Sequence, residues 1–173
     1  MCAGVEVRDG GKARKIYFVG ESAALPVLFE DSTEIEWVRW GRRKNEKCSF
    51  PQGGWARLSA IQAGDWHVYN PRRAVAVVER FLQGERSSAL RGRRLSQWVL
   101  PPKGQSIECL VIGDGEDRRA YVVTTSPPAK LKALADRWPL LVTRSAPALL
   151  PPPTEMSVVA ACSDDARVEM REL

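Results

Sequence analysis

The second residue of the chain, Cys2, carries two reactive groups once the initiator methionine is removed. Removal is common when a small residue follows Met1, and it would leave a free α-amine beside the Cys2 thiol. An α-amine has a pKa of about 8, so part of it is uncharged at neutral pH and can attack an aldehyde to form a Schiff base. The thiol then closes a thiazolidine ring, and a ring-opened abasic deoxyribose carries such an aldehyde. The alternative interpretation is that cysteine stands at position 2 by chance.

The single histidine of the chain, His67, is the candidate general base for this chemistry. The alternative is a packing or hydrogen-bonding role beside Trp66 and Tyr69. One histidine completes neither a Ser/His/Asp set nor a Cys/His/Asn set, which argues against a peptidase acting on other proteins. The cysteines are far apart and form no Cys-x-x-Cys pair, so we predict neither a structural metal nor a cofactor. They are Cys2, Cys48, Cys109 and Cys162.

A basic segment occupies the middle of the chain. The net charge of the protein is +5, but residues 39–94 contain 13 Lys and Arg against 4 Asp and Glu, a local charge of +9. Arginines bind phosphate with a forked geometry, and the tryptophans among them offer flat faces for unstacked bases. We therefore expect contact with single-stranded nucleic acid, and a solvated surface is the alternative. Trp40 is the candidate base-stacking residue, and the candidate phosphate contacts are Arg42, Arg43, Arg57, Arg72 and Arg73.

Short apolar or alternating runs predict the strands of a mostly antiparallel sheet. They cover residues 15–19, 24–30, 34–40, 106–112, 119–125 and 140–143, with a hairpin connection at 113–117. Residues 73–83 fit a helix or a strand, and the Ala-, Leu- and Lys-rich residues 129–135 predict a short helix. We expect residues 84–104 to form a long surface loop.

The chain has the length of one domain with a tail. Prolines from position 147 onward predict a domain at 1–146 and a Pro-rich linker and tail at 147–173, in which 156–162 is apolar enough for an edge strand. No run of residues reaches the ~20 apolar positions of a membrane span. The N-terminus lacks the pattern of a secretory signal, so we expect a cytoplasmic protein. Nothing in the sequence demands more than a monomer.

Four blocks along residues 1–143 occur in an order similar to that of the SOS response-associated peptidase (SRAP) family. They are Met1-Cys2-Ala3-Gly4; Leu25-Pro26-Val27-Leu28 with Arg39-Trp40-Gly41-Arg42; Cys48-Ser49-Phe50-Pro51-Gln52-Gly53-Gly54-Trp55; and Tyr121-Val122-Val123-Thr124-Thr125 with Ala135-Asp136-Arg137-Trp138-Pro139-Leu140-Leu141. The resemblance implies an α+β fold around a curved, barrel-like antiparallel sheet with few short helices. It also implies Cys2 at the floor of a positively charged groove for single-stranded DNA, covalent capture of abasic sites and a role in the DNA damage (SOS) response.

The chain departs from the family pattern at three positions that concern catalysis. The family's Asn-Ala-Arg segment is missing before Cys48, Arg57 stands where the family has a glutamate, and Ala135 stands where it has a histidine. The family arginine is retained as Arg137, which is structural or DNA-facing. Trp55 and Trp138 take the places of family Phe and Met, so we expect both in the core.

Three hypotheses follow. The first is covalent capture of abasic DNA through Cys2, and the second is a non-catalytic nucleic-acid-binding module on a degenerate SRAP scaffold. The second is suggested by Arg57 and Ala135, because arginine strengthens phosphate binding while alanine transfers no proton. The third is a protein-interaction module whose tryptophan-rich face binds a protein partner.

Overall fold

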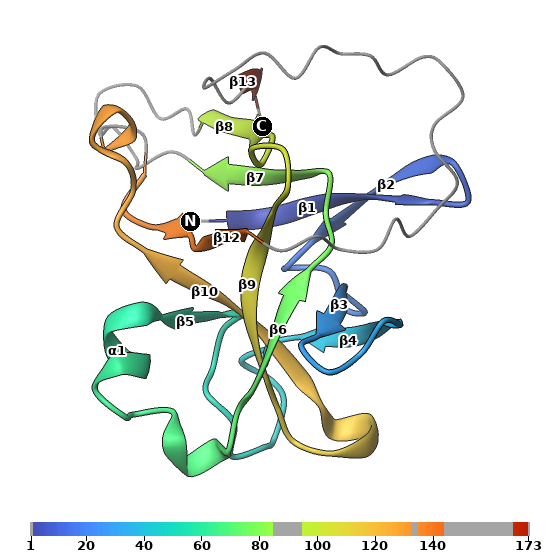
Figure 1. Ribbon diagram of the computed structural model, residues 1–173, viewed down its shortest axis with the longest axis vertical. Coiled ribbons are helices and arrows are strands. Elements are labelled where there is room, and N and C mark those ends of the chain that lie inside the picture. The colour runs from blue at the N-terminus through green and yellow to red at the C-terminus, as the bar shows by residue number, and fades with distance from the viewer. Residues whose placement is uncertain (1, 85–94, 133–134, 144–167, 173) are drawn as a thin grey trace.

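The computed structural model describes residues 2–84, 95–132, 135–143 and 168–172, and β-strands dominate it (Figure 1). The strands are β1 (Cys2–Asp9), β2 (Lys12–Tyr17), β3 (Ala24–Phe29), β4 (Ile35–Trp40), β5 (Trp55–Arg57), β6 (Arg72–Ala76), β7 (Arg80–Gly84), β8 (Leu95–Val99), β9 (Gln105–Ile112), β10 (Arg119–Thr125), β11 (Trp138–Pro139), β12 (Leu141–Thr143) and β13 (Val168–Glu172). The helices are α1 (Leu58–Gln62) and the 3-10 turns η1 (His67–Tyr69), η2 (Gly115–Asp117) and η3 (Ala129–Leu131). None of these helices is long and apolar enough to cross a membrane.

Five strands close into a barrel, in the order β4, β3, β6, β9 and β10. The barrel closes because β10 pairs with β9 on one side and with β4 on the other. Its pairings are antiparallel except for β10 with β4, and the short β5 also pairs with β10 in parallel. The expectation of a mostly antiparallel, barrel-like fold with few short helices is confirmed at this level, and the resemblance to the SRAP fold stays a prediction.

A second sheet has the order β13, β8, β7, β1 and β2 and lies across the upper end of the barrel in Figure 1. Its strands β1 and β2 form a tight hairpin from Asp9 to Lys12. The two residues between them, Gly10 and Gly11, both have positive φ angles, 56° and 82°. Such a turn matches the twist of a hairpin and strongly favours glycine at both positions.

Alternating side chains of β9 and β10 divide the apolar residues into two cores. One set of their side chains points into the barrel, for example Cys109 and Val122, and joins the main core with Trp40 and Phe81. The other set, which includes Tyr121, points outward into a second cluster. Residues of α1 and η1 pack against this outer cluster. Both strands are therefore buried on both faces, and the long apolar runs of 106–112 and 119–125 result from this.

Most of the predicted strands are present. The runs at 24–30, 34–40, 106–112 and 119–125 correspond to β3, β4, β9 and β10, and β9 and β10 are joined by the predicted hairpin. Residues 140–143 contain β12, and the strand predicted at 15–19 lies earlier, at β2. The ambiguous 73–83 segment contains two strands, β6 and β7. Trp138 is buried, and Trp55 is partly buried against the main core, as expected.

Three predictions about local structure are wrong in part. Residues 95–99, expected in a loop, form β8, because Trp98 and Val99 supply buried side chains to the second sheet. The helix predicted at 129–135 is only the 3-10 turn η3 where the structure describes it. The first strand, β1, was not predicted. The edge strand predicted at 156–162 and the boundary at 146 lie outside the described residues, while β13 of the predicted tail pairs with β8.

Candidate anion-binding site

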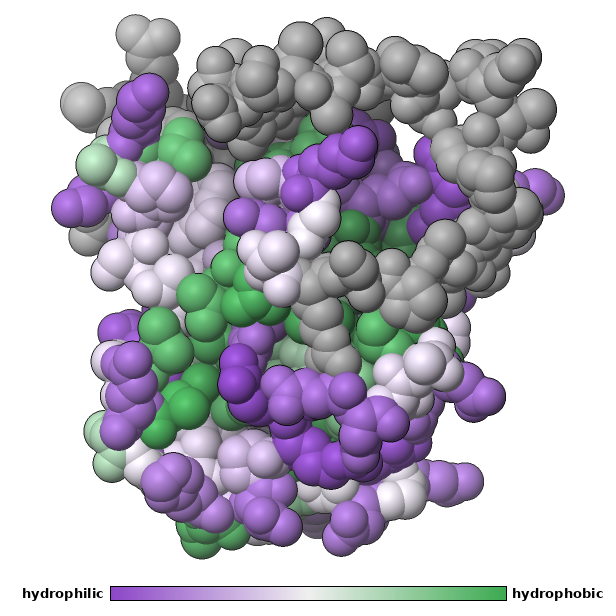
Figure 2. Space-filling view, in the orientation of Figure 1, coloured by the Kyte–Doolittle hydropathy of each residue, from purple (hydrophilic) through white to green (hydrophobic). Residues whose placement is uncertain are grey.

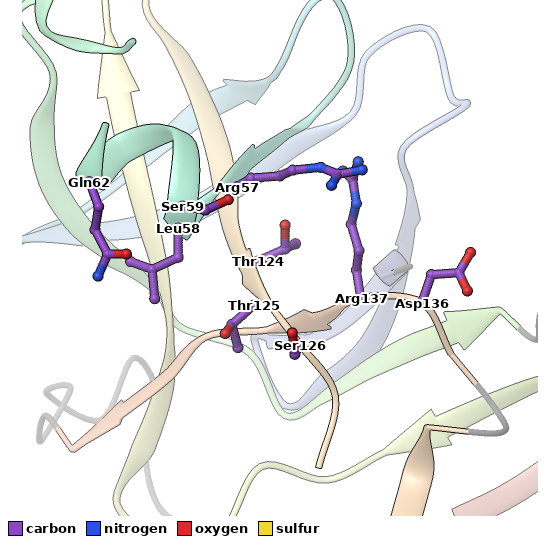
Figure 3. Close-up of a pocket in the computed structure, with 9 residues that line it drawn as sticks. All are labelled: Arg57, Leu58, Ser59, Gln62, Thr124, Thr125, Ser126, Asp136 and Arg137. Atoms are coloured by element: carbon purple, nitrogen blue, oxygen red, sulfur yellow. The ribbon is translucent and has the colours of Figure 1, made fainter. Parts of the chain in front are cut away.

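Two arginines, Arg57 and Arg137, line a pocket with a volume of 210 Å³, which we call the two-arginine pocket. Figure 3 shows their guanidinium groups pointing toward one another above Thr124. In the described part of the chain, no carboxylate lies within ion-pairing distance of either guanidinium. The other residues that line the pocket are Leu58, Ser59, Gln62, Thr124, Thr125, Ser126 and Asp136.

The C-terminal end of β10 brings the two arginines together. On one side β5 pairs with it in parallel, so that Arg57 is the partner of Thr124 in the register. On the other side β11 pairs with it antiparallel, so that Trp138 is the partner of Thr125. Arg137 directly precedes β11. The two arginines thus flank one strand end, although they are far apart in the sequence.

The electrostatics of the pocket favour an anion. Burial lowers the pKa of Arg137, the positive charge of Arg57 lowers it further, and Asp136 opposes both effects. An arginine nevertheless stays protonated in proteins, so the pocket holds two positive charges that repel each other. Hydroxyl groups of Ser59 and Thr125 add hydrogen-bond donors to the lining. A phosphate or carboxylate offers the oxygens that such a donor set binds.

The backbone of Cys2 is connected to Arg137 through Gln83, while its thiol is in the core. The Trp55 indole N–H donates to the Cys2 carbonyl oxygen at 2.8 Å. Cys2 also pairs with Gln83, whose side-chain amide donates to the Arg137 carbonyl oxygen at 2.7 Å. The thiol itself is fully buried and donates to the Gly4 carbonyl oxygen at 3.5 Å. Burial raises its pKa to about 12, so almost none of it is thiolate at neutral pH.

The prediction that Trp40 offers an exposed face to a base is wrong, because its side chain is fully buried. Its indole N–H donates to the Gly54 carbonyl oxygen at 3.0 Å. Its ring packs edge-on against Phe18 and Trp55, with centroid distances of 5.5 and 6.2 Å. Trp40 is therefore a core residue that holds the loop before β5 in place.

Arg42 and Arg43 bond to the protein backbone. One guanidinium nitrogen of Arg42 donates to the Glu46 carbonyl oxygen at 3.0 Å. Arg43 donates to the carbonyl oxygens of Trp40 and Gly20, and its guanidinium carbon lies 4.0 Å from the centroid of the Phe18 ring. Burial lowers the pKa of Arg43. These contacts assign both arginines a structural role.

Arg72 and Arg73, on β6, form ion pairs with carboxylates. Arg72 pairs with Asp31 at 3.0 Å, and Arg73 pairs with Glu108 at 2.6 Å and with Glu30 at 3.8 Å. The hydrogen bond to Glu108 raises the pKa of Arg73. These carboxylates neutralise much of the positive charge of Arg72 and Arg73. The two arginines of β6 therefore attract a phosphate less than Arg57 and Arg137 do.

His67 does not meet Cys2. It is exposed and begins η1, which follows α1 at the lower end of the molecule in Figure 1, whereas β1 lies in the upper half. His67 is also absent from the lining of the two-arginine pocket. Across the described residues, no three His, Cys, Asp or Glu side chains gather into a group that resembles a metal site.

Sequence reasoning missed the hydroxyl residues of the pocket. Thr124, Thr125 and Ser126 follow one another where β10 ends, and Thr124 donates to the Ala56 carbonyl oxygen at 3.3 Å. The available signal was three consecutive hydroxyl residues at the end of an apolar run. Hydroxyl residues at a strand end either form hydrogen bonds with the backbone or bind ligands. Only their position beside two arginines, which the sequence does not show, favours ligand binding.

Comparison with known proteins adds no relative: no family model matches the chain, and no curated protein matches it. The fold and site define a β-barrel protein with a pocket at one strand end that two arginines line.

Proposed function

We propose that this chain binds single-stranded nucleic acid through its phosphate groups, with the two-arginine pocket as the central contact. The observation that carries the proposal is the facing pair of guanidinium groups, Arg57 and Arg137, that has no carboxylate partner within the described residues. A bound phosphate would replace their mutual repulsion with charge-assisted hydrogen bonds, which are among the strongest in proteins.

The surroundings of the pocket support a single strand over a duplex. A pocket of 210 Å³ has room for one phosphate group. Figure 2 shows hydrophobic surface between α1 and β10 on this face of the molecule. Leu58, Ile61 and Leu140 are partly buried residues that pack against the outer cluster. Apolar surface beside a phosphate contact can pack against the sugars and bases that a single strand exposes.

The test is a binding titration with a fluorescently labelled single-stranded oligonucleotide. We expect Arg57→Ala and Arg137→Ala each to weaken binding about 10-fold, because a hydrogen bond to a charged group contributes roughly 1.5 to 3 kcal/mol. Arg57→Glu, which restores the acid of the family pattern, should weaken it further. The readout is fluorescence anisotropy at fixed salt concentration.

Arg72→Ala is the matched control, since it removes the same charge from an exposed strand where Asp31 already pairs with it. Its effect should stay within about 3-fold. If Arg57→Ala, Arg137→Ala and Arg72→Ala all lose the same affinity, net charge alone drives binding. Absence of binding would contradict the proposal and favour the protein-partner hypothesis.

A second candidate function, covalent capture of an aldehyde by Cys2, is supported by the pairing of Cys2 with Gln83, whose side-chain amide donates to the carbonyl oxygen of the pocket residue Arg137. Without Met1, the Cys2 α-amine adds to the aldehyde carbon, and water leaves as the C=N bond forms. The sulfur then adds to the same carbon while the thiol proton passes to the nitrogen, which closes the thiazolidine. The buried thiol must first leave the core, so we expect this reaction to be slow.

Abasic single-stranded DNA tests this second candidate with Met1-trimmed protein. A slow, denaturation-resistant adduct with the expected intact mass should form, and Cys2→Ala should abolish it. Cys48→Ala, which removes an exposed thiol, should leave it unchanged. Salt-sensitive binding of the same DNA without any adduct would exclude capture and leave the non-covalent function.

A further inference from the structure

Trp37 is an exposed tryptophan on the outer face of the barrel. Along β4 the side chains alternate, so that Val38 and Trp40 are buried while Trp37 and Arg39 face outward. Trp37 is 45% exposed, whereas the other five tryptophans are buried or half-buried. The exposed indole of β4 is therefore that of Trp37, three residues before the buried Trp40 and on the opposite face of the strand.

Arg14 of β2 contacts this indole, and Lys12 stands two residues before it, on the same face of the strand. β2 is the edge strand of the second sheet, and residues 12–15 are exposed. The guanidinium carbon of Arg14 lies 5.5 Å from the centroid of the Trp37 ring, which is a cation–π contact. In the part of the chain that the structure describes, neither Arg14 nor Lys12 forms an ion pair with a carboxylate. The charge of both side chains is therefore available to an external anion.

We propose that Lys12, Arg14 and Trp37, which together we call the Trp37 surface, form a second contact site for single-stranded nucleic acid. A base stacks on the exposed indole, and the two cations contact the phosphates beside it. The inference rests on the proposed function, because it adds a second stretch of the same strand. Figure 1 places β2 and β4 on one side of the molecule and β5 and α1 on the other, so the two sites engage different nucleotides.

An acidic peptide that adds a strand to the edge of β2 is the competing occupant. Strand addition uses the backbone of β2 and its side chains. It makes no use of Trp37, which belongs to β4 in the other sheet. Nucleic acid uses both features of the surface, the cations and the flat indole, and the observations therefore favour it.

The experiment compares oligonucleotides of about 4 and about 16 nucleotides, the range of site sizes known for single-strand-binding folds. We expect Trp37→Ala to weaken binding of the longer one about 10-fold, since stacking on one aromatic side chain has an effect of this size. Arg14→Ala should weaken it less, and Trp37→Phe should retain part of the affinity. The shorter oligonucleotide, bound at the two-arginine pocket, should be unaffected by all three.

Val19→Ala is the control, because it shortens an apolar side chain that is 85% exposed and provides no stacking face. Unchanged affinity of Trp37→Ala for the longer oligonucleotide would overturn the inference. Displacement of the oligonucleotide by polyglutamate of equal charge, with equal efficiency, would also overturn it in favour of a peptide ligand. If Trp37→Ala does not fold, Trp37→Phe and Arg14→Ala still decide the question.

The two proposals can fail separately. If Arg57→Ala and Arg137→Ala bind both oligonucleotides normally while Trp37→Ala loses affinity for the longer one, the pocket proposal is wrong and the Trp37 surface stands. If only the pocket variants lose affinity, the Trp37 surface carries no contact. Absence of any binding by the unaltered protein overturns both.

Discussion

At the scale of single residues, the environment of a side chain decides whether its chemistry is available. Cys2 has the position of a nucleophile, yet burial raises the pKa of its thiol to about 12. Cys109 lies in the same core, and burial raises the pKa of its thiol as well, with a smaller contribution from Cys2. Burial in the core keeps the Cys2 thiol protonated and unreactive. Capture chemistry at Cys2 therefore requires local opening of β1.

The raised pKa of Cys2 makes the stability of the fold depend on pH under alkaline conditions. The folded thiol keeps its proton up to a pH of about 12, whereas the unfolded chain releases it near the ordinary value of 9.0. The stabilisation is therefore complete below pH 9.0 and is lost as the pH rises toward 12. When the pH is raised from about 8 to about 10.5, the unfolding free energy of the unaltered chain should fall by about 2 kcal/mol more than that of Cys2→Ala.

Urea unfolding at the two pH values measures this difference. Cys48→Ala is the matched control because that thiol is exposed, and its loss should equal that of the unaltered chain. Equal losses for Cys2→Ala and the unaltered chain would show that the thiol is accessible to solvent and ready to react.

At the scale of elements, the loop between β4 and β5 determines where Arg57 points. Its two ends meet where the backbone groups of Arg42 and Gly53 exchange hydrogen bonds, both at 2.9 Å. Gly41 allows this approach, because a Cβ atom there would lie 2.1 Å from the Gly53 carbonyl oxygen. The loop then delivers the chain to β5, whose last residue is Arg57.

Substitution of Gly41 by alanine tests this loop. Gly41 and Gly10 have almost the same φ, 58° and 56°, but nothing lies within 4 Å of a Cβ atom at Gly10. We expect Gly10→Ala to cost about 1 kcal/mol of unfolding free energy for the backbone conformation alone. Gly41→Ala should cost at least about 2 kcal/mol more, because the backbone of Gly53 must also move.

Urea unfolding of the two variants gives both values, and oligonucleotide titration gives a second readout. Gly41→Ala should also weaken binding at the two-arginine pocket, while Gly10→Ala should not. Equal stability of the two variants would mean that the loop adjusts freely and does not position Arg57.

At the scale of the whole molecule, β10 connects the core to the site. It pairs with β4, β5, β9 and β11, so barrel closure and pocket assembly depend on one strand. The net charge of +5 adds a general attraction for nucleic acid. When the binding titration is repeated at several salt concentrations, removal of Arg57 or Arg137 should reduce the slope of log K against log salt by about 0.7 each, since each phosphate contact releases condensed counterions.

The sequence by itself determined the β-rich fold, because alternation and glycine turns are local patterns. The runs that became β3, β4, β9 and β10 carry this information within a few residues. The strand β1 was missed although Gly10 and Gly11 mark its hairpin, because the exposed and charged residues of β2 hide the alternation. The sequence also located the excess of positive charge, but it did not show which arginines form ion pairs with carboxylates of the protein.

Only the tertiary structure decided which arginines are available to a ligand. Arg72 meets Asp31, 41 residues away, whereas Arg57 and Arg137 meet each other without an acid between them among the described residues. It also decided that Trp37 is exposed and Trp40 is buried. The physical reason is that ion pairing and strand register are long-range properties: a shift of one residue along a strand moves a side chain from the core to the surface.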